Sequence, residues 1–377
     1  MRFLNRVLRG GLVLSGLGAA VLAILAFLGF AVPAFDLFNH LQPVLFFATL
    51  GVLALSPWLL AEGPPRSFML TLVATGFIAS ASTVIPEALA GLAPREPVSG
   101  DDRPMLTLMT HNLFGSNYDM QRVVRTIFAE DPDIVALQEF FPDQSAALHP
   151  LIVARYPYFA TCQGGKRANI AVYAKLPFTQ IEDGACADSV AGGQRTAHII
   201  AVFTLPDQTT FTVVNTHLDW PLPLARQRAE FAALGKMLNG LGGPLLLVGD
   251  FNSTPWSYAL RWFVSGNRLT RHTHNLVTFP LRWWYLDGWN PTPPFLPLDH
   301  VMTRGEVAVH ELHLGPRTGS DHLPVAFAFS VTPVGKQLDC CPPDQARSIS
   351  KTSSPSDPPS VAATSLAPAA WWSGWTR

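Results

Sequence analysis

The amino-acid sequence predicts an α+β protein in which a membrane region of helices precedes a globular domain of two packed β-sheets with helices outside. The chain has 377 residues, of which 48% are hydrophobic and only 14% are charged, whereas about a quarter are charged in a typical soluble domain. This shortage of charge is concentrated before residue 87. From 105 to 331, many short apolar strands alternate with few amphipathic helices, which favours two packed sheets over a doubly wound sheet.

The first 95 residues are expected to form the membrane region. Three stretches contain no Asp, Glu, Lys or Arg: Gly10–Phe35, Leu37–Ala61 and Ser67–Pro86. About 20 apolar residues suffice for a helix to cross a bilayer, so we expect transmembrane helices at about 11–33, 41–61 and 67–86. Thr and Ser residues dilute the third stretch. A cleaved signal peptide would explain the first stretch but not the two that follow it.

The charges flanking these stretches indicate the orientation of the chain. Arg2, Arg6 and Arg9 precede the first stretch, and the first loop contains no Lys or Arg. The positive-inside rule then predicts a cytoplasmic N-terminus. Three crossings make the protein a multi-pass protein of the inner or plasma membrane and place its globular domain outside the cytoplasm, in the periplasm. Insertion of only two stretches would reverse this placement.

Short apolar stretches predict the strands of the globular domain, expected over residues 105–331. They lie at 105–114, 133–140, 169–178, 197–218, 245–250, 298–302 and 323–331. The stretch at 197–218 is predicted to form two strands joined by a turn at 206–208.

Two helices are expected between these strands. Met120, Val123, Val124, Ile127 and Phe128 recur at the spacing of one helix face, and Pro132 ends the helix that they predict. A second helix is expected over about 224–238. The tail at 332–377 is rich in Ser, Pro, Thr and Ala and shows no periodicity, so we expect it to be disordered.

Polar side chains stand where the predicted strands end or are about to begin. They are Asn112, Glu139, His217, Asp250, Asn252, Asp299, Asp321 and His322. Carboxylates, amides and imidazoles gathered at one edge of a sheet form a site for polar chemistry, whereas a core excludes such groups unless they are paired. Each residue alone is more often a turn former or a satisfied structural residue, so only the combination indicates a site.

The motifs around these residues resemble a known family. They read "THNLF", "ALQEF", "NTHLD", "GDFNSTP", "LDHVM" and "GSDHLPV", in this order. Together they are similar to the endonuclease/exonuclease/phosphatase superfamily, which has the deoxyribonuclease-I-like fold, and the resemblance covers about residues 105–331. It implies a four-layered α/β/β/α sandwich that hydrolyses phosphate esters with a divalent metal, usually magnesium.

The resemblance assigns a metal-binding role to three residues. Glu139 matches the metal-binding glutamate, and Asn112 and Asp321 stand where the family completes the surroundings of the metal. Hard oxygen ligands of this kind suit Mg²⁺, and Mn²⁺ is the alternative ion. Zinc would instead require clustered His and Cys ligands, and the adjacent Cys340 and Cys341 fall in the tail.

The resemblance assigns catalytic roles to the other five residues. Asp250 matches the residue that orients and deprotonates water, and Asn252 the one that holds the phosphate. His322 matches the histidine that binds the phosphoryl oxygen or protonates the leaving group, and Asp299 its carboxylate partner. His217 matches a second histidine that contacts phosphate. The residue types suit this chemistry independently, because hydrolysis of an anionic ester needs a cation, a base and a positioned acid.

Cys162 and Cys186 flank the strand predicted at 169–178. In an extracytoplasmic domain they could form a disulfide, which would stabilise the fold by roughly 3 kcal/mol. The alternative is two unrelated reduced thiols.

The substrate stays open at this stage. A duplex nuclease needs a basic footprint, yet the formal net charge is −1 and only Lys166, Arg167 and Lys175 cluster loosely. A lipid head group, a nucleic acid or a small phosphate ester remains. The aromatic segment at 283–289 could line a substrate cleft or rest on the bilayer. Apart from the lipid bilayer no partner is indicated, and a catalytically silent scaffold is the alternative to an enzyme.

Overall fold

The computed structural model describes residues 2–59, 63–93, 104–163, 167–182, 186, 196–285 and 288–332. Residues up to Gly335 form one compact unit. The tail after residue 332 lies outside the described residues, as do the side chains of Trp283, Trp284, Tyr285 and Trp289. The expectation of disorder in the tail and the two interpretations of the aromatic side chains therefore stay predictions.

The N-terminal region consists of helices, as expected. It contains α1 (Arg2–Phe27), the 3₁₀ segments η1 (Leu28–Phe30) and η2 (Pro33–Leu41), α2 (Gln42–Leu59) and α3 (Pro64–Ala90). Three stretches are long and apolar enough to cross a membrane: Arg9–Phe30, Pro33–Pro57 and Arg66–Ala90. The first α-helix was expected to end at about residue 33 but ends at Phe27. Val32 is extended, as is usual for the residue before a proline.

Close packing and internal hydrogen bonds suit these helices to a membrane. A Cβ atom on Gly76 of α3 would lie 2.6 Å from the Cα atom of Ala20 of α1, so glycine permits the close approach of the two helices. Most of the hydroxyl groups that dilute the third stretch bond to their own helix, whereas Ser80 Oγ has no partner among the described residues. Thr71 Oγ1 donates to the Ser67 carbonyl at 3.0 Å, and Thr75 Oγ1 to the Thr71 carbonyl at 2.9 Å. Such hydroxyls need no water.

Two mixed sheets of six strands each form the domain that follows. The first sheet has the order β13-β14-β1-β2-β4-β3, with β13 (Val307–Leu314), β14 (Val325–Val331), β1 (Leu106–Asn112), β2 (Ile134–Gln138), β4 (Ile170–Ala174) and β3 (Tyr158–Cys162). The second has the order β5-β6-β7-β8-β12-β9, with β5 (Phe178–Ile181), β6 (Ala197–Thr204), β7 (Thr210–His217), β8 (Leu245–Asp250), β12 (Asp299–Arg304) and β9 (Thr270–Arg271).

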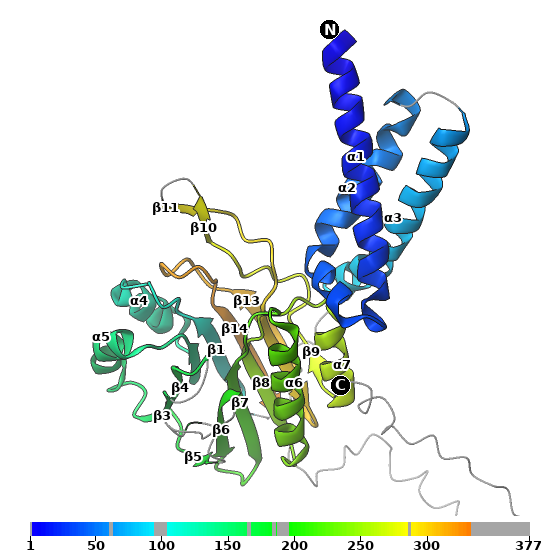
Figure 1. Cartoon of the computed structure of the whole chain (residues 1–377). Coiled ribbons are helices and arrows are strands. Elements are labelled where there is room, and N and C mark those ends of the chain that lie inside the picture. Colours follow the sequence, from blue (N-terminus) through cyan, green and yellow to red (C-terminus); the bar gives the residue numbers. More distant parts are fainter. Residues whose placement is uncertain are drawn as a thin grey trace, which may run out of the picture. The chain divides into compact units, whose positions relative to one another are not determined.

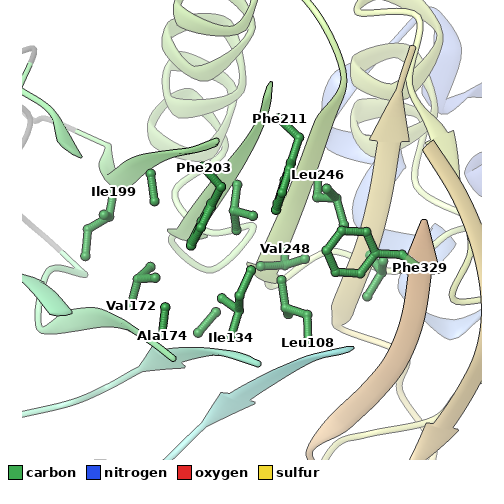
Figure 2. Close-up of a cluster of buried hydrophobic side chains, with 14 of the residues drawn as sticks. Leu108, Ile134, Val172, Ala174, Ile199, Phe203, Phe211, Leu246, Val248 and Phe329 are labelled. Carbon is green, nitrogen blue, oxygen red and sulfur yellow. The ribbon is translucent and has the colours of Figure 1, made fainter. Parts of the chain in front are cut away.

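Helices cover the outer faces of both sheets, which confirms the four-layered α/β/β/α sandwich (Figure 1). The first sheet packs against α4 (Met120–Glu130) and α5 (Pro142–Ile152), and the second against α6 (Leu224–Asn239) and α7 (Tyr258–Gly266). The core between the sheets is apolar from both sides. Leu108, Ile134 and Val172 of the first sheet face Ile199, Phe203, Phe211 and Val248 of the second (Figure 2).

The predicted strand at 169–178 is wrong in one respect. It is split into β4 and β5, which belong to different sheets. Pro177 stands between them, and because proline cannot donate to a ladder hydrogen bond, the strand is interrupted there. A further hairpin of β10 (Arg282–Tyr285) and β11 (Gly288–Pro291) was not predicted and forms a separate two-stranded sheet.

Candidate active site

The sheet topology brings the predicted site residues to one edge of the sandwich. Strands β1 and β2 are parallel, with Asn112 beside Gln138, so Asn112 and Glu139 end neighbouring strands. Strands β7 and β8 are also parallel, with His217 beside Asp250. Strand β12 runs antiparallel to β8 and begins with Asp299 beside Asp250. Strand ends of both sheets therefore converge on one place.

Unusual backbone conformations fix the turns at this edge. Gly249 has a φ of +139°, and a Cβ atom there would overlap the carbonyl oxygen of Thr216, so only glycine fits before Asp250. Glu139 and Asn252 have φ values of 53° and 46°. Non-glycine residues rarely adopt such left-handed conformations, which cost energy unless the surrounding structure holds them in place.

A buried polar bridge joins the two sheets directly below the site. Gln138 Nε2 donates to Asn215 Oδ1 at 2.7 Å. Asn215 Nδ2 in turn donates to the carbonyl groups of Leu137 at 3.0 Å and Ala171 at 2.9 Å. Because both side chains are fully buried, these hydrogen bonds hold the ends of β2 and β7 at a defined separation.

His322 lies between two carboxylates. Its Nδ1 atom is 2.8 Å from Asp299 Oδ2, and its Nε2 atom is 3.7 Å from Asp250 Oδ2. Burial alone would lower the pKa of His322, but Asp299 and Asp250 outweigh it and raise the pKa to about 10. The imidazole is therefore a proton donor at neutral pH, held by Asp299.

Asp250 is surrounded by groups that orient it. Burial raises the pKa of its carboxyl group to about 7, since it outweighs the stabilisation by His322. Oδ1 accepts a hydrogen bond from the Asn252 backbone N–H at 2.8 Å, and Oδ2 accepts one from Asn112 Nδ2 at 2.9 Å. A carboxyl group with a pKa near neutrality can serve as a general base.

Glu139 and Asp321 form the more exposed side of the site. Glu139 Oε2 accepts a hydrogen bond from Gly115 N at 2.7 Å, and Oε1 lies 3.4 Å from Asn112 Nδ2. The side chains of Glu139 and Asp321 are 20% and 10% exposed, compared with 1% for Asp250. Burial, with the charge of Glu139 as a further contribution, raises the pKa of Asp321 to about 6.

His217 and Asn252 complete the set. His217 Nε2 is 3.6 Å from Asp250 Oδ2 and 3.4 Å from Asn252 Nδ2, which also donates to the Leu218 carbonyl at 2.9 Å. Burial lowers the pKa of His217 to about 4, so this imidazole is neutral. All eight residues selected from the sequence thus lie together, each connected to another member by a contact of 4.0 Å or less.

Sequence reasoning missed a cluster of charges beside this site. Arg167 Nη1 lies 3.9 Å from Glu139 Oε1, and Arg167 Nε donates to Asp219 Oδ1 at 3.1 Å. Arg226 donates to the other oxygen of Asp219 at 3.1 Å. The sequence signal was present, because Asp219 ends the motif "NTHLD" and Arg167 belongs to the loose basic cluster. Lys166 of that cluster lies outside the described residues.

His111, next to Asn112 in sequence, does not belong to the site. It is fully buried and its Nε2 atom is 2.7 Å from Thr318 Oγ1. Burial lowers the pKa of His111 to about 3. The residue packs in the interior.

Two groups of ligand atoms suit a metal ion. Asp250, Asp299 and His322 each offer one atom, all within 4.8 Å of one another. The hard oxygens of Glu139 and Asp321 are the second group. Burial raises the pKa of Asp321, with the charge of Glu139 as a smaller contribution, and a cation bound there would favour the ionised carboxylates. In addition, Asp299 Oδ1 is buried and has no hydrogen-bond partner among the described residues. The donor set therefore fits a cation that prefers oxygen.

A comparison with family models decides what this arrangement is. Residues 109–322 match the model described as "Endonuclease/Exonuclease/phosphatase family". The chain belongs to this family. Members of the endonuclease/exonuclease/phosphatase family are hydrolases that act on phosphoester bonds and typically use a divalent metal, so the sandwich described here is a phosphoesterase or nuclease fold.

Individual relatives of this endonuclease/exonuclease/phosphatase domain are distant. A protein of Vibrio campbellii named "UPF0294 protein" is 30% identical over 132 residues, which cover 34% of this chain and 43% of that protein. The chain thus spans less than half the length of this curated relative. The crystal structure of the endonuclease/exonuclease/phosphatase from Beutenbergia cavernae is 20% identical, covers 61% of this chain and 72% of its own, and has a TM-score of 0.45. The crystal structure of the endonuclease/exonuclease/phosphatase from Bacteroides vulgatus is 19% identical, covers 61% of this chain and 100% of its own, and has a TM-score of 0.49.

Proposed function

We propose that the protein is a membrane-anchored, Mg²⁺-dependent phosphoesterase that hydrolyses a phosphodiester or phosphomonoester with water. The position of His322 carries this proposal. Asp299 holds its Nδ1 atom, and its Nε2 atom lies 3.7 Å from Asp250 Oδ2. A buried acid and a buried base therefore lie next to each other, and hydrolysis of an ester requires both.

Each residue then has a distinct task in the proposed reaction. Asp250 accepts the proton of the attacking water, since its pKa of about 7 suits a base at neutral pH. His322 binds a phosphoryl oxygen and donates its proton to the departing oxygen, and Asp299 keeps the ring oriented. Asn252 and the neutral His217 contact the phosphate from the side of β7. No cysteine or serine nucleophile is required.

Glu139, Asn112 and Asp321 are the proposed ligands of Mg²⁺, with Mn²⁺ as the alternative ion. A bound Mg²⁺ would neutralise the charge of the phosphate oxygens. The other cluster, which contains His322, suits a metal less well, because a ligand imidazole must be deprotonated and the pKa of His322 is raised to about 10. Glu139 is also the most exposed of these acids, which favours access of the ion together with a substrate.

Two observations support the proposal that the domain is periplasmic. Three stretches are apolar enough to cross the membrane, and the basic residues precede the first. In addition, Cys162 and Cys186 form a disulfide, with their Cα atoms 4.9 Å apart. Disulfides persist mainly in oxidising compartments. We test the orientation with a reporter enzyme that is active only outside the cytoplasm, fused after residue 335; a silent reporter in a stably expressed fusion would contradict it.

The substrate within this class is a phosphate ester on a lipid head group, a nucleic acid or a small molecule. Among the described residues, the two arginines beside the site, Arg167 and Arg226, are both paired with Asp219. A duplex nuclease would need a broader basic surface, which makes a lipid or a small ester the better-supported choice.

The experiment uses the full-length protein in detergent micelles and a panel of phosphate esters, with Mg²⁺ and with chelator. We expect metal-dependent hydrolysis of at least one substrate. Asp250→Asn and His322→Ala should each reduce it by about 10²–10⁴-fold. His313→Ala is the control, because His313 is half-exposed and pairs with Glu130 away from the site. A folded protein that binds a panel member without cleaving it would instead favour a silent scaffold.

A further inference from the structure

A groove separates the end of the membrane helix α3 from the catalytic-domain helix α7. Its volume is about 550 Å³, which is within the range of small-molecule sites. Thr83, Pro86 and Ala90 line it on the side of α3, and Leu260, Val264 and Leu269 line it on the side of the domain. The groove is therefore mostly apolar and is shared by the two regions of the chain.

The groove lies at the level of lipid head groups. Its α3 wall belongs to the last nine residues of the span that ends at Ala90, and nine helical residues extend over about 13 Å. The span has 25 residues, about five more than the hydrocarbon core requires, so its last turns reach the polar boundary of the bilayer. Asp36 and His40, in the segment η2 between α1 and α2, also contact the domain, at Tyr258 and Thr254. The ends of the spans that face the domain thus lie on the same side of the membrane.

An unpaired cation lines this groove. The guanidinium of Arg261 forms no hydrogen bond and no ion pair with any described residue, and its Nε and Nη2 atoms are buried without a hydrogen-bond partner. Its guanidinium carbon lies 4.2 Å from the centre of the Tyr258 ring, which supports the side chain from one face. Leaving such donors unsatisfied is costly, so the guanidinium requires an acceptor that the described residues do not supply.

The second arginine in the groove differs. Arg271 is paired with Glu87 of α3, and His274 Nδ1 lies 3.1 Å from the same carboxylate. These contacts balance the charge of Arg271 and leave that of Arg261 unbalanced. The groove therefore combines an apolar wall at the membrane boundary with one free positive charge, which complements a lipid that carries a phosphate and acyl chains.

We propose that the groove between α3 and α7 binds one anionic glycerophospholipid. Its phosphate is bound by Arg261, and the part of its acyl chains nearest the head group packs along α3. The groove is separate from the catalytic residues, and a lipid there joins the membrane helices to the domain. Binding at this site does not depend on whether the protein hydrolyses phosphate esters.

The test is native mass spectrometry of the full-length protein released from detergent micelles, titrated with phosphatidylglycerol or with phosphatidylcholine of the same acyl chains. We expect one retained phosphatidylglycerol per chain and at least about a tenfold lower occupancy with phosphatidylcholine. Arg261→Gln should lower the retention of phosphatidylglycerol by about tenfold, and Arg261→Lys should preserve most of it. Arg268→Gln is the matched control, because Arg268 is an exposed arginine outside the groove.

A second variant distinguishes a loss of lipid binding from a loss of folding. Val264→Trp fills the groove and leaves Arg261 in place, so it should also abolish retention while the helical circular dichroism is unchanged. Equal retention by Arg261→Gln and the wild type would overturn the proposal. So would equal retention of the two lipids, or the absence of any retained lipid on the wild-type protein.

Discussion

Asp36, in η2 between the helices α1 and α2, accepts a hydrogen bond of 2.8 Å from the backbone N–H of Tyr258 at the start of α7. The same carboxylate accepts hydrogen bonds from Ala259 N at 3.0 Å and Ser257 Oγ at 3.1 Å. It thus caps a helix of the catalytic domain from a residue more than 200 positions earlier in the chain. Asn252 of the candidate site lies only five residues before Ser257.

Removal of this cap should loosen α7 and the loop that precedes it. We expect Asp36→Ala to weaken the start of α7 by about 1–2 kcal/mol, because two backbone N–H groups lose their acceptor. Hydrogen exchange of residues 257–260 in the full-length protein measures this as faster exchange. Asp119→Ala is the control, since Asp119 caps α4 in the same way through Arg122 N; equal acceleration at α7 in both variants would contradict the assignment.

Replacement of Asp299 should impair catalysis more than binding. Asp299→Asn keeps the shape of the side chain but removes the charge that orients His322 and holds its proton. We expect kcat to fall by about 10²–10⁴-fold with little change in KM, measured on whichever ester the panel identifies. Asp207→Asn, in an exposed turn, should leave both constants unchanged. A tenfold rise in KM at unchanged kcat would mean that Asp299 acts in binding only.

Replacement of Glu139 should raise the Mg²⁺ concentration that hydrolysis requires. Chelation should abolish hydrolysis and Mg²⁺ should restore it. In Glu139→Gln the Mg²⁺ concentration for half-maximal activity should rise by more than about 10-fold, because one anionic ligand is lost. Glu182→Gln, an exposed site, is the control. An unchanged metal dependence in Glu139→Gln would remove Glu139 from the proposed ligands.

Glu230 should make the protein less stable as the pH rises. Burial raises the pKa of Glu230 from 4.5 to about 7 in the folded state, against the hydrogen bond that it accepts from Asp219 N. Between these values the unfolded chain loses this proton while the folded chain keeps it. The stabilisation is therefore complete below pH 4.5 and is lost as the pH rises through 7.

A glutamine at position 230 should remove this effect. From pH 5 to pH 8, the free energy of unfolding of Glu230→Gln should rise by about 2–3 kcal/mol relative to the wild type. Chemical denaturation of the full-length protein at several pH values measures it, with the exposed Glu311→Gln as the control. Parallel pH profiles of wild type and Glu230→Gln would show that Glu230 titrates normally.

Local patterns predicted the elements whose apolar spacing is regular, and they failed where the spacing is interrupted. The helix predicted from Met120, Val123 and Ile127 is present as α4. Helix α5 was missed because Pro142 and Pro150 break its pattern, although both prolines are accommodated at Pro142–Ile152. Strand β13 was missed because His310, Glu311 and His313 interrupt its apolar residues.

The sequence by itself determined the apolar membrane stretches, the type of fold and the eight polar residues at the strand ends. Each of these follows from local spacing or from short motifs, which are properties of neighbouring residues. Tertiary structure alone decided that Arg167 lies beside Glu139 and that Asp36 caps α7. It also decided that Arg261 has no partner among the described residues. Contacts of this kind join residues far apart in the chain, and their energies depend on burial and distance, which only the folded backbone defines.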